Sequence, residues 1–158
     1  MPAIDVARFR EVVGHFASGV VVITAMTENG PVGFTCQSFG SLSLEPILVS
    51  FAARTDGNSW PKIQEVGTLA VNVLSSRQET IARVFATSEA DKFIGVPWTP
   101  GVLGAPIIAD SLAHLEGHVV SVNSFGDHDV VVVGVEHVLS RDGLPLVYFR
   151  GGFGSFAV

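Results

Sequence analysis

Residues 33–51 read GFTCQSFGSLSLEPILVSF and combine strand-forming residues with more glycines and small hydroxyl side chains than a plain core strand needs. Because side chains alternate between the two faces of a strand, Thr35 and Gln37 are expected on one face and Cys36 and Ser38 on the other. Both faces therefore mix polar and apolar groups. Such an edge is typical of the wall of a pocket for a planar, partly apolar ligand, and a turn-rich β-meander with surface serines is the alternative that the spacing leaves open.

The residues before this stretch predict a helix and then a hairpin. Residues 4–16 carry apolar side chains at helical spacing, and Asp5 is placed to cap the first turn. Residues 20–26 are rich in β-branched side chains and predict a buried strand. Turn-forming residues at 28–31 then join this strand to the 33–51 stretch as an antiparallel hairpin.

The residues after the stretch predict further strands with short helices between them. After a break at Glu45-Pro46, we expect a strand over 47–53, a short helix from Trp60 and a strand over 68–74. A capping box at 76–79 is expected to open a helix that runs to about Ala86, and a loop over 95–106 follows, with Trp98 as an aromatic plug. Two long strands over 112–124 and 129–139 around a tight turn, and a last strand over 146–150, complete the expected order. This pattern predicts a mainly β (α+β) fold, an antiparallel barrel with two or three covering helices, in a single domain over residues 1–158.

Composition narrows the class of function. The formal net charge is -6 with only 9 lysines and arginines, which argues against a nucleic-acid partner, because binding phosphates needs clustered cations. Charged residues make up 15% of the chain and hydrophobic residues 47%. A surface this short of charge predicts a buried subunit interface, most simply that of a homodimer.

The single cysteine, Cys36, excludes an intramolecular disulfide and a multi-thiolate metal site, and it favours a reducing compartment. No stretch approaches the roughly 20 apolar residues of a membrane span, and the N-terminus has no signal pattern, so we expect a cytoplasmic protein without membrane association.

Candidate ligand and metal sites are few. His114, Glu116 and His118 alternate on one predicted strand, but antiparallel strands routinely carry a polar outer row, so we expect no metal site. Cys36 is read as a packing residue rather than a nucleophile. No glycine-rich dinucleotide motif follows a strand, so any dinucleotide must bind in another way.

Two local features point to ligand contacts. Asn58 or Ser59 is placed to cap the short helix at Trp60, where free N–H groups attract anions, although an ordinary capped helix is the plainer reading. His128 follows Gly126 and Asp127 at a predicted hairpin tip, from which its side chain can reach over a pocket mouth; a turn histidine bonded to Asp127 is the alternative.

Taken together, five segments of the chain resemble the flavin reductase-like family, in the order and spacing of that family and over almost the whole chain. The segments are Val20–Thr24, Gly33–Phe39 with Ser41–Pro46, Asp91–Phe93, Gly126–His128 and Leu146–Gly151. The sequence is most similar to the short NAD(P)H:flavin reductase components of two-component monooxygenases.

The resemblance implies an FMN-binding split barrel that forms a homodimer, with flavin near the subunit interface. It implies contacts to the flavin ring and ribityl chain from Thr35, Cys36, Gln37 and Ser38, a continuing wall from Ser43, Ser50, Phe51 and Ala52, phosphate contacts from Asn58, Ser59 and Lys92, and a nicotinamide site beside His128. FMN or FAD would be the flavin and NADH or NADPH the reductant.

The resemblance also implies a reaction. Hydride would pass directly from nicotinamide C4 to flavin N5, so the protein would need no acid or base, and the reduced flavin would go to a separate oxygenase. Two other functions stay open at this point: a pyridoxamine-phosphate-oxidase-like enzyme, and a flavin-binding or redox-sensing module without turnover.

Overall fold

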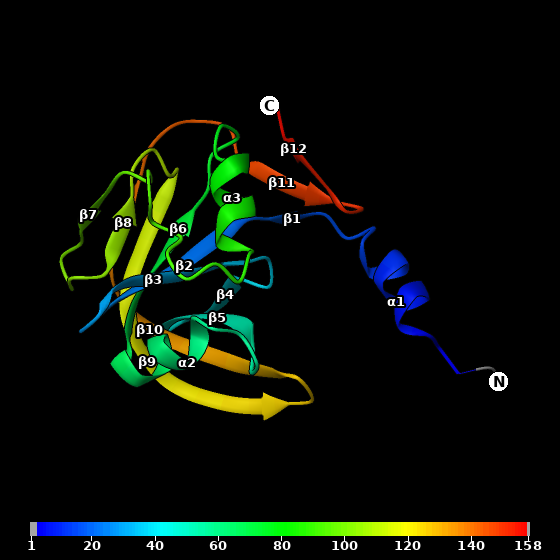
Figure 1. The fold of residues 1–158 in the computed structure, drawn as a ribbon, viewed down its shortest axis with the longest axis horizontal. Helices are drawn as coiled ribbons and strands as arrows, with labels where there is room; N and C mark the ends of the chain where they lie inside the picture. Colours follow the sequence, from blue (N-terminus) through cyan, green and yellow to red (C-terminus); the bar gives the residue numbers. More distant parts are fainter. Residues whose placement is uncertain (1–2, 158) are drawn as a thin grey trace.

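The computed structural model describes residues 3–157 and has three helices among many short strands (Figure 1). The elements are α1 (Val6–Val13), β1 (Ser18–Gly19), β2 (Val21–Thr27), β3 (Gly30–Cys36), β4 (Gly40–Leu44), β5 (Ile47–Arg54), α2 (Trp60–Val66), β6 (Thr68–Val73), α3 (Glu79–Phe85), β7 (Trp98–Pro100), β8 (Pro106–Ile108), β9 (Ala113–Phe125), β10 (His128–Ser140), β11 (Leu146–Phe149) and β12 (Gly152–Ser155).

The main sheet has seven antiparallel strands in the order β3-β2-β6-β9-β10-β5-β4. The 33–51 stretch therefore supplies both edges, β3 and β4, together with the start of β5. The residues after β3 are joined to β5, because the Ser38 hydroxyl donates to the Ala52 carbonyl oxygen at 3.1 Å and accepts from the Ala52 N–H at 2.8 Å. The sheet thus curls into a partly closed barrel, and the predicted antiparallel barrel with helical covers is confirmed.

Strand β2 explains why residues 20–26 are almost continuously apolar. Val21 and Ile23 pack in one hydrophobic cluster with Phe51, whereas Val20 and Val22 pack in a second cluster with Phe85. All four side chains of this run are at most 3% exposed. The strand is buried on both faces, which removes the alternation expected of a half-exposed strand.

Three local predictions were wrong. Residues 95–106 are not a plain loop, because Trp98–Pro100 and Pro106–Ile108 pair as the β7–β8 hairpin. The capping box at 76–79 does not form: Gln78 is itself the N-cap of α3, and its amide instead accepts from the Ser75 N–H and donates to the Ala109 carbonyl oxygen. The glycine-rich end, beyond the predicted last strand, forms β12 and pairs with β11.

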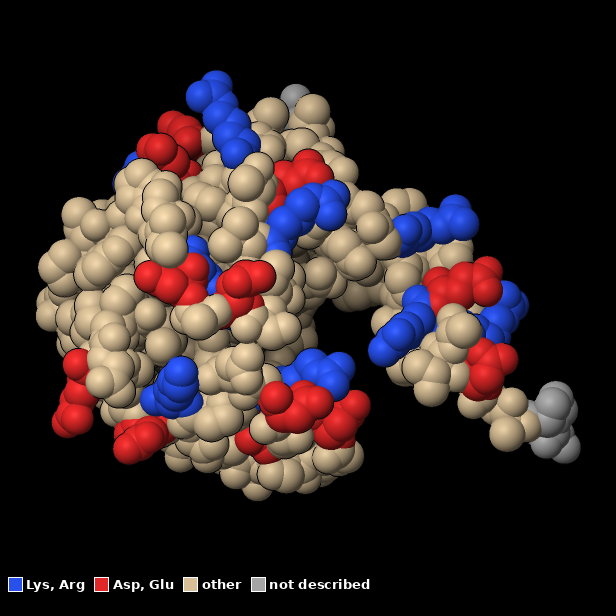
Figure 2. Space-filling view, viewed as in Figure 1, with Lys and Arg blue, Asp and Glu red and all other residues tan. Residues whose placement is uncertain are grey.

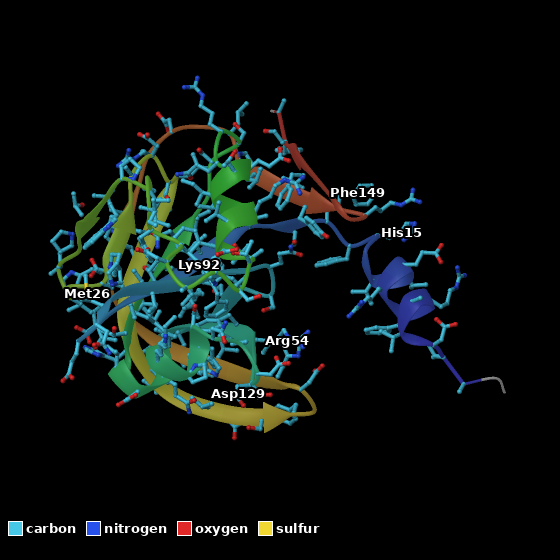
Figure 3. The ribbon with its side chains drawn as sticks, viewed as in Figure 1. His15, Met26, Arg54, Lys92, Asp129 and Phe149 are labelled. Carbon is cyan, nitrogen blue, oxygen red and sulfur yellow. The ribbon has the colours of Figure 1, made fainter. Side chains whose placement is uncertain are left out.

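Helix α1 is the least integrated element. Asp5 caps it as predicted, by accepting a hydrogen bond from the Arg8 N–H at 2.7 Å. However, none of its residues is buried, and it projects from the body as an arm (Figure 1). Its end is held by the Arg150 N–H, which donates to the Gly14 carbonyl oxygen, and by an edge contact between His15 and Phe149 (Figure 3). The amphipathic helix is thus present, but within residues 3–157 its apolar face stays exposed.

Among residues 3–157, no helix is long and apolar enough to cross a membrane.

Candidate functional site

A cavity of about 650 Å³, here called the inner cavity, lies where β3, β5, the start of α2, the end of α3 and the β9–β10 tip converge. It gathers most of the residues that the resemblance implied as ligand contacts, although they are spread over about ninety positions of the sequence. Those that line it are Thr35, Cys36, Gln37, Ser38, Ala52, Asn58, Ser59, Lys92 and His128.

Three expected contact residues do not line the inner cavity. Phe51 is 1% exposed and lies inside the barrel, with its ring 6.1 Å from that of Phe34 and 5.8 Å from that of Trp60. Ser43 lies on the edge strand β4, and Ser50 lies on β5 opposite Gly40. These residues therefore lie behind or beside the wall of the inner cavity.

The wall formed by β3 and the residues after it is fixed by its own hydrogen bonds. The Thr35 hydroxyl donates to the Ala82 carbonyl oxygen of α3 at 2.6 Å. Burial raises the pKa of the Cys36 thiol, so that this group stays protonated at neutral pH and acts as packing. The exposed Gln37 amide makes no side-chain hydrogen bond to any of residues 3–157, which leaves its donors and its acceptor available to a ligand.

Lys92 is buried beneath α3 and over β3 (Figure 3). Its ammonium donates to the carbonyl oxygens of Gly33 at 3.1 Å and Phe85 at 3.2 Å, and lies 3.5 Å from the Ser59 hydroxyl. Burial lowers the pKa of Lys92. The Ser59 hydroxyl also donates to the Gly33 carbonyl oxygen, at 2.8 Å.

These bonds tie three elements together at Gly33. A Cβ at this glycine would lie 2.8 Å from the Ile23 carbonyl oxygen and 3.0 Å from the Phe85 ring, so β3 can approach α3 this closely only with glycine at position 33. Lys92 and Ser59 thus brace the cavity wall, and Lys92 places a cation beside the cavity without a carboxylate partner among the described residues.

The mouth of the inner cavity carries one ion pair and one histidine–carboxylate hydrogen bond, which the sequence did not reveal as a unit. Arg54 donates to both carboxylate oxygens of Asp56, each at 2.9 Å, and this pairing lowers the pKa of Asp56. His128 is the Cα partner of Arg54 in the β5–β10 ladder, and its Nδ1 lies 2.7 Å from the Asp127 carboxylate. The hydrogen bond from His128 lowers the pKa of Asp127.

Part of this mouth had a signal in the sequence, because Arg54 and Asp56 directly follow the strand predicted over 47–53. The pairing across to His128 depends on the register of two strands more than seventy residues apart, which no local pattern reveals.

A buried carboxylate anchors the tip that carries His128. Asp129, the next residue, accepts from the Trp60 indole N–H at 2.8 Å and from the Ser124 hydroxyl at 2.6 Å. These two hydrogen bonds, with that from Ser124 the larger, lower the pKa of Asp129. The β9–β10 tip and the start of α2 are therefore positioned relative to each other by one side chain.

Glu116 and His118, from the histidine row on β9, make separate contacts. The Glu116 carboxylate is buried and accepts from the N–H groups of Val102 and Leu103, which holds the β7–β8 loop. His118 instead lies 3.0 Å from Glu136. Within residues 3–157, no group of three metal-ligating side chains is close enough to hold an ion.

The inner cavity fits a flavin in the chemistry of its lining. Apolar groups of Phe34, Ala52 and Phe85 supply surface for an aromatic ring, and the Gln37 amide supplies hydrogen-bonding groups for its polar edge. The Lys92 cation at the α2 side suits a phosphate. Figure 2 shows a notch between the body and the α1 arm, with basic and acidic side chains along its lower rim.

A family model described as "Flavin reductase like domain" matches residues 13–157. The reductase subunit HsaB of a flavin-dependent monooxygenase from Mycobacterium tuberculosis (strain ATCC 25618 / H37Rv) is 43% identical over 153 residues, which cover 95% of this chain and 82% of that protein.

Two solved structures superpose closely on the fold. Nitrilotriacetate monooxygenase component B from Mycobacterium thermoresistibile has a TM-score of 0.92 at 41% identity, covering 96% of this chain and 86% of that one. The NADH:FAD oxidoreductase SgcE6 of Streptomyces globisporus C-1027, solved in complex with NAD and FAD fragments, has a TM-score of 0.92 at 35% identity. The match covers 97% of this chain and 93% of that one.

Proposed function

The chain belongs to the flavin reductase-like domain family, and from this premise we propose that it is an NAD(P)H-dependent flavin reductase that supplies reduced flavin to a separate monooxygenase. The observation that carries the proposal is the inner cavity, in which the candidate flavin contacts of β3, β5 and α2 and the candidate nicotinamide contact His128 line one continuous surface.

The residues of the inner cavity act by holding and orienting the flavin ring and the nicotinamide ring. A bound flavin supplies the hydride acceptor for the reduced nicotinamide. The bonds of Thr35 to Ala82 and of Ser38 to Ala52 fix the β3 wall before any ligand binds, which removes the cost of ordering it. Gln37 offers its free amide to the polar edge of a ring, and His128 offers a flat surface or a ring N–H at the opposite side of the mouth.

No protein acid or base is required for this transfer. Consistent with that, the Cys36 thiol has a raised pKa and the Asp127 and Asp56 carboxylates have lowered pKa values, so none of these groups exchanges a proton easily near neutral pH.

The phosphate of a flavin mononucleotide is assigned to the α2 side of the inner cavity, at Asn58, Ser59 and Lys92. Lys92 supplies charge there while its hydrogen bonds brace the Gly33 and Phe85 carbonyl oxygens. The Ser88 hydroxyl, which makes no hydrogen bond to the rest of residues 3–157, is a further donor at this side of the cavity.

The working form of the protein is assigned as a homodimer. On α1 and just after it, Val6, Phe9, Val12 and Phe16 are between 56% and 83% exposed, and no residue of α1 is buried. A surface groove of about 750 Å³ between α1 and the body shares Gln37 and Ser38 with the inner cavity. A second copy that covers the α1 arm would therefore also close the cavity on its Gln37 side.

The compartment is assigned as the cytoplasm. Cys36 is a free thiol, and a reductase that consumes reduced nicotinamide requires a reducing supply.

A steady-state assay tests the proposed function. The purified protein should oxidise NADH or NADPH only when FMN or FAD is added, with a rate that rises with flavin concentration. Binding of flavin without nicotinamide oxidation would instead identify a non-catalytic flavin-binding module. Oxidation of pyridoxamine phosphate would identify the other enzyme class.

A further inference from the structure

Two further compartments lie beside the inner cavity on the α2 side of the molecule. A middle compartment of about 280 Å³ shares Asn58, Ser59, Ser88 and Lys92 with the inner cavity. An outer compartment of about 730 Å³ adjoins the middle one, with which it shares Val32, Lys62 and Phe93 among others. The three adjoin in a row, here called the trough, that runs from the candidate phosphate site toward the β2–β3 turn.

The trough leads away from the candidate nicotinamide site. None of Arg54, Asp56 and His128 lines the middle or the outer compartment. In Figure 3 the labelled Lys92 lies between the labelled Arg54, at the mouth of the inner cavity, and the labelled Met26, the neighbour of Thr27 in the outer compartment. A ligand that continues past the flavin phosphate would enter the trough, whereas one held at His128 would not.

The charges along the trough follow an order. The chain has only two lysines, Lys62 and Lys92, and both line the middle compartment. Neither forms an ion pair with a carboxylate among residues 3–157. The carboxylate of Glu89 also lines this compartment, so two cations face one carboxylate there. In a chain with a net charge of -6, this local excess of positive charge suits a pair of linked phosphates.

The outer compartment has the opposite character. Glu28, Glu65 and Asp91 line it together with the apolar side chains of Val66 and Ile94. Carboxylates would repel a further phosphate, but they accept hydrogen bonds from ribose hydroxyls, and the apolar side chains offer surface to a purine. A cavity of about 730 Å³ is also within the usual range of nucleotide-sized sites.

We propose that the trough binds the adenosine monophosphate half of a flavin dinucleotide, with Lys62 as the residue that selects FAD over FMN. This proposal rests on the proposed function, because it assumes that the flavin phosphate lies at Asn58, Ser59 and Lys92. Lys62 lines only the middle and outer compartments, so it would contact the second phosphate of FAD and no part of FMN.

The test compares dissociation constants of FAD and FMN for the full chain and for Lys62→Ala and Lys62→Glu, measured by flavin fluorescence. The original protein should bind FAD more tightly than FMN. Lys62→Ala should weaken FAD binding about tenfold, the usual effect of one lost charge-assisted hydrogen bond, and should leave FMN binding within about twofold. Lys62→Glu should weaken FAD binding further, because it adds repulsion.

Arg77→Ala is the matched control. Arg77 is an exposed cation that lines none of the three compartments, so its loss changes the net charge equally and should leave both affinities unchanged. Thermal melts of all variants report that each is folded.

Three results would overturn the inference alone. Equal weakening of FAD and FMN, or no change in either, would show that Lys62 does not select the dinucleotide, while FMN-dependent NADH oxidation would still support the proposed function. A raised KM for NADH with unchanged FAD binding would assign the trough to the reductant. If neither flavin binds or supports NADH oxidation in the original protein, the proposed function fails and the inference with it.

Discussion

Replacing His128 by alanine tests whether this residue contacts the reductant or only shapes the β9–β10 turn. The hydrogen bond of His128 joins it to the adjacent Asp127, and its side chain is 41% exposed. Removing it therefore leaves no buried polar group unsatisfied, and the two long strands β9 and β10 pair independently of it. His128→Ala should fold and melt like the original protein.

The kinetic effect follows from the loss of one contact to the nicotinamide. One hydrogen bond or ring contact contributes about 1–1.5 kcal/mol, which corresponds to roughly tenfold in rate. Initial rates of NAD(P)H oxidation with saturating flavin should therefore give a kcat/KM for the reductant that is about tenfold lower, with the Kd for FMN within twofold of the original.

His137→Ala provides the control, because His137 lies on the same strand roughly 30 Å from His128. It should change neither parameter. A normally folded His128→Ala protein with the original kcat/KM would refute the assignment, and a joint loss of thermal stability and flavin binding would show that the histidine is structural.

Three further outcomes are expected. Riboflavin, which lacks the phosphate, should bind at least tenfold more weakly than FMN in equilibrium titrations, because it loses charge-assisted contacts at the α2 side of the cavity. Equal affinities of riboflavin and FMN would contradict the assigned phosphate site. Sedimentation velocity at micromolar concentration should show a dimer that Phe9→Glu converts toward monomer, since Phe9 is 57% exposed on the unpartnered face of α1; a monomeric original protein would contradict the dimer. Asp129 has a lowered pKa in the folded protein, so its stabilising contribution is complete above its unfolded pKa of about 3.9 and is lost as pH falls through the lower folded value. Thermal melts between neutral and strongly acidic pH should therefore show a smaller acid-induced loss of Tm in Asp129→Asn than in the original protein, and identical pH dependence would rule out this contribution.

Local sequence patterns predicted those parts of the fold that depend on local physics. The β-branched run at 20–26, the turn at 28–31 and the Asp5 cap each appear where the sequence places them, because strand preference, turn chemistry and capping act within a few residues. The predicted capping box at 76–79 does not form because of a tertiary contact: the Gln78 amide donates a hydrogen bond to the Ala109 carbonyl oxygen, thirty-one residues away.

The candidate site was predictable in its members but not in their contacts. The resemblance picked out Lys92 and Ser59, yet their bonds to the Gly33 carbonyl oxygen depend on how β3, α2 and α3 pack. Phe51 was expected in the pocket wall, but the pleat of β5 turns its ring into the barrel, as the alternation of buried and half-buried residues along that strand shows. The Arg54–Asp56 pair at the mouth was not predicted as part of the site, because only the register of β5 and β10 places it beside His128.

The most direct measurement of the central claim is anaerobic rapid mixing of the protein and FMN with NADH that carries deuterium at the transferred C4 position. If the protein reduces flavin by direct hydride transfer, flavin absorbance near 450 nm should fall in a phase that requires the protein and is slower with deuterated than with ordinary NADH. Flavin absorbance that stays constant, or that falls at the same rate without the protein, would contradict the assignment as a flavin reductase.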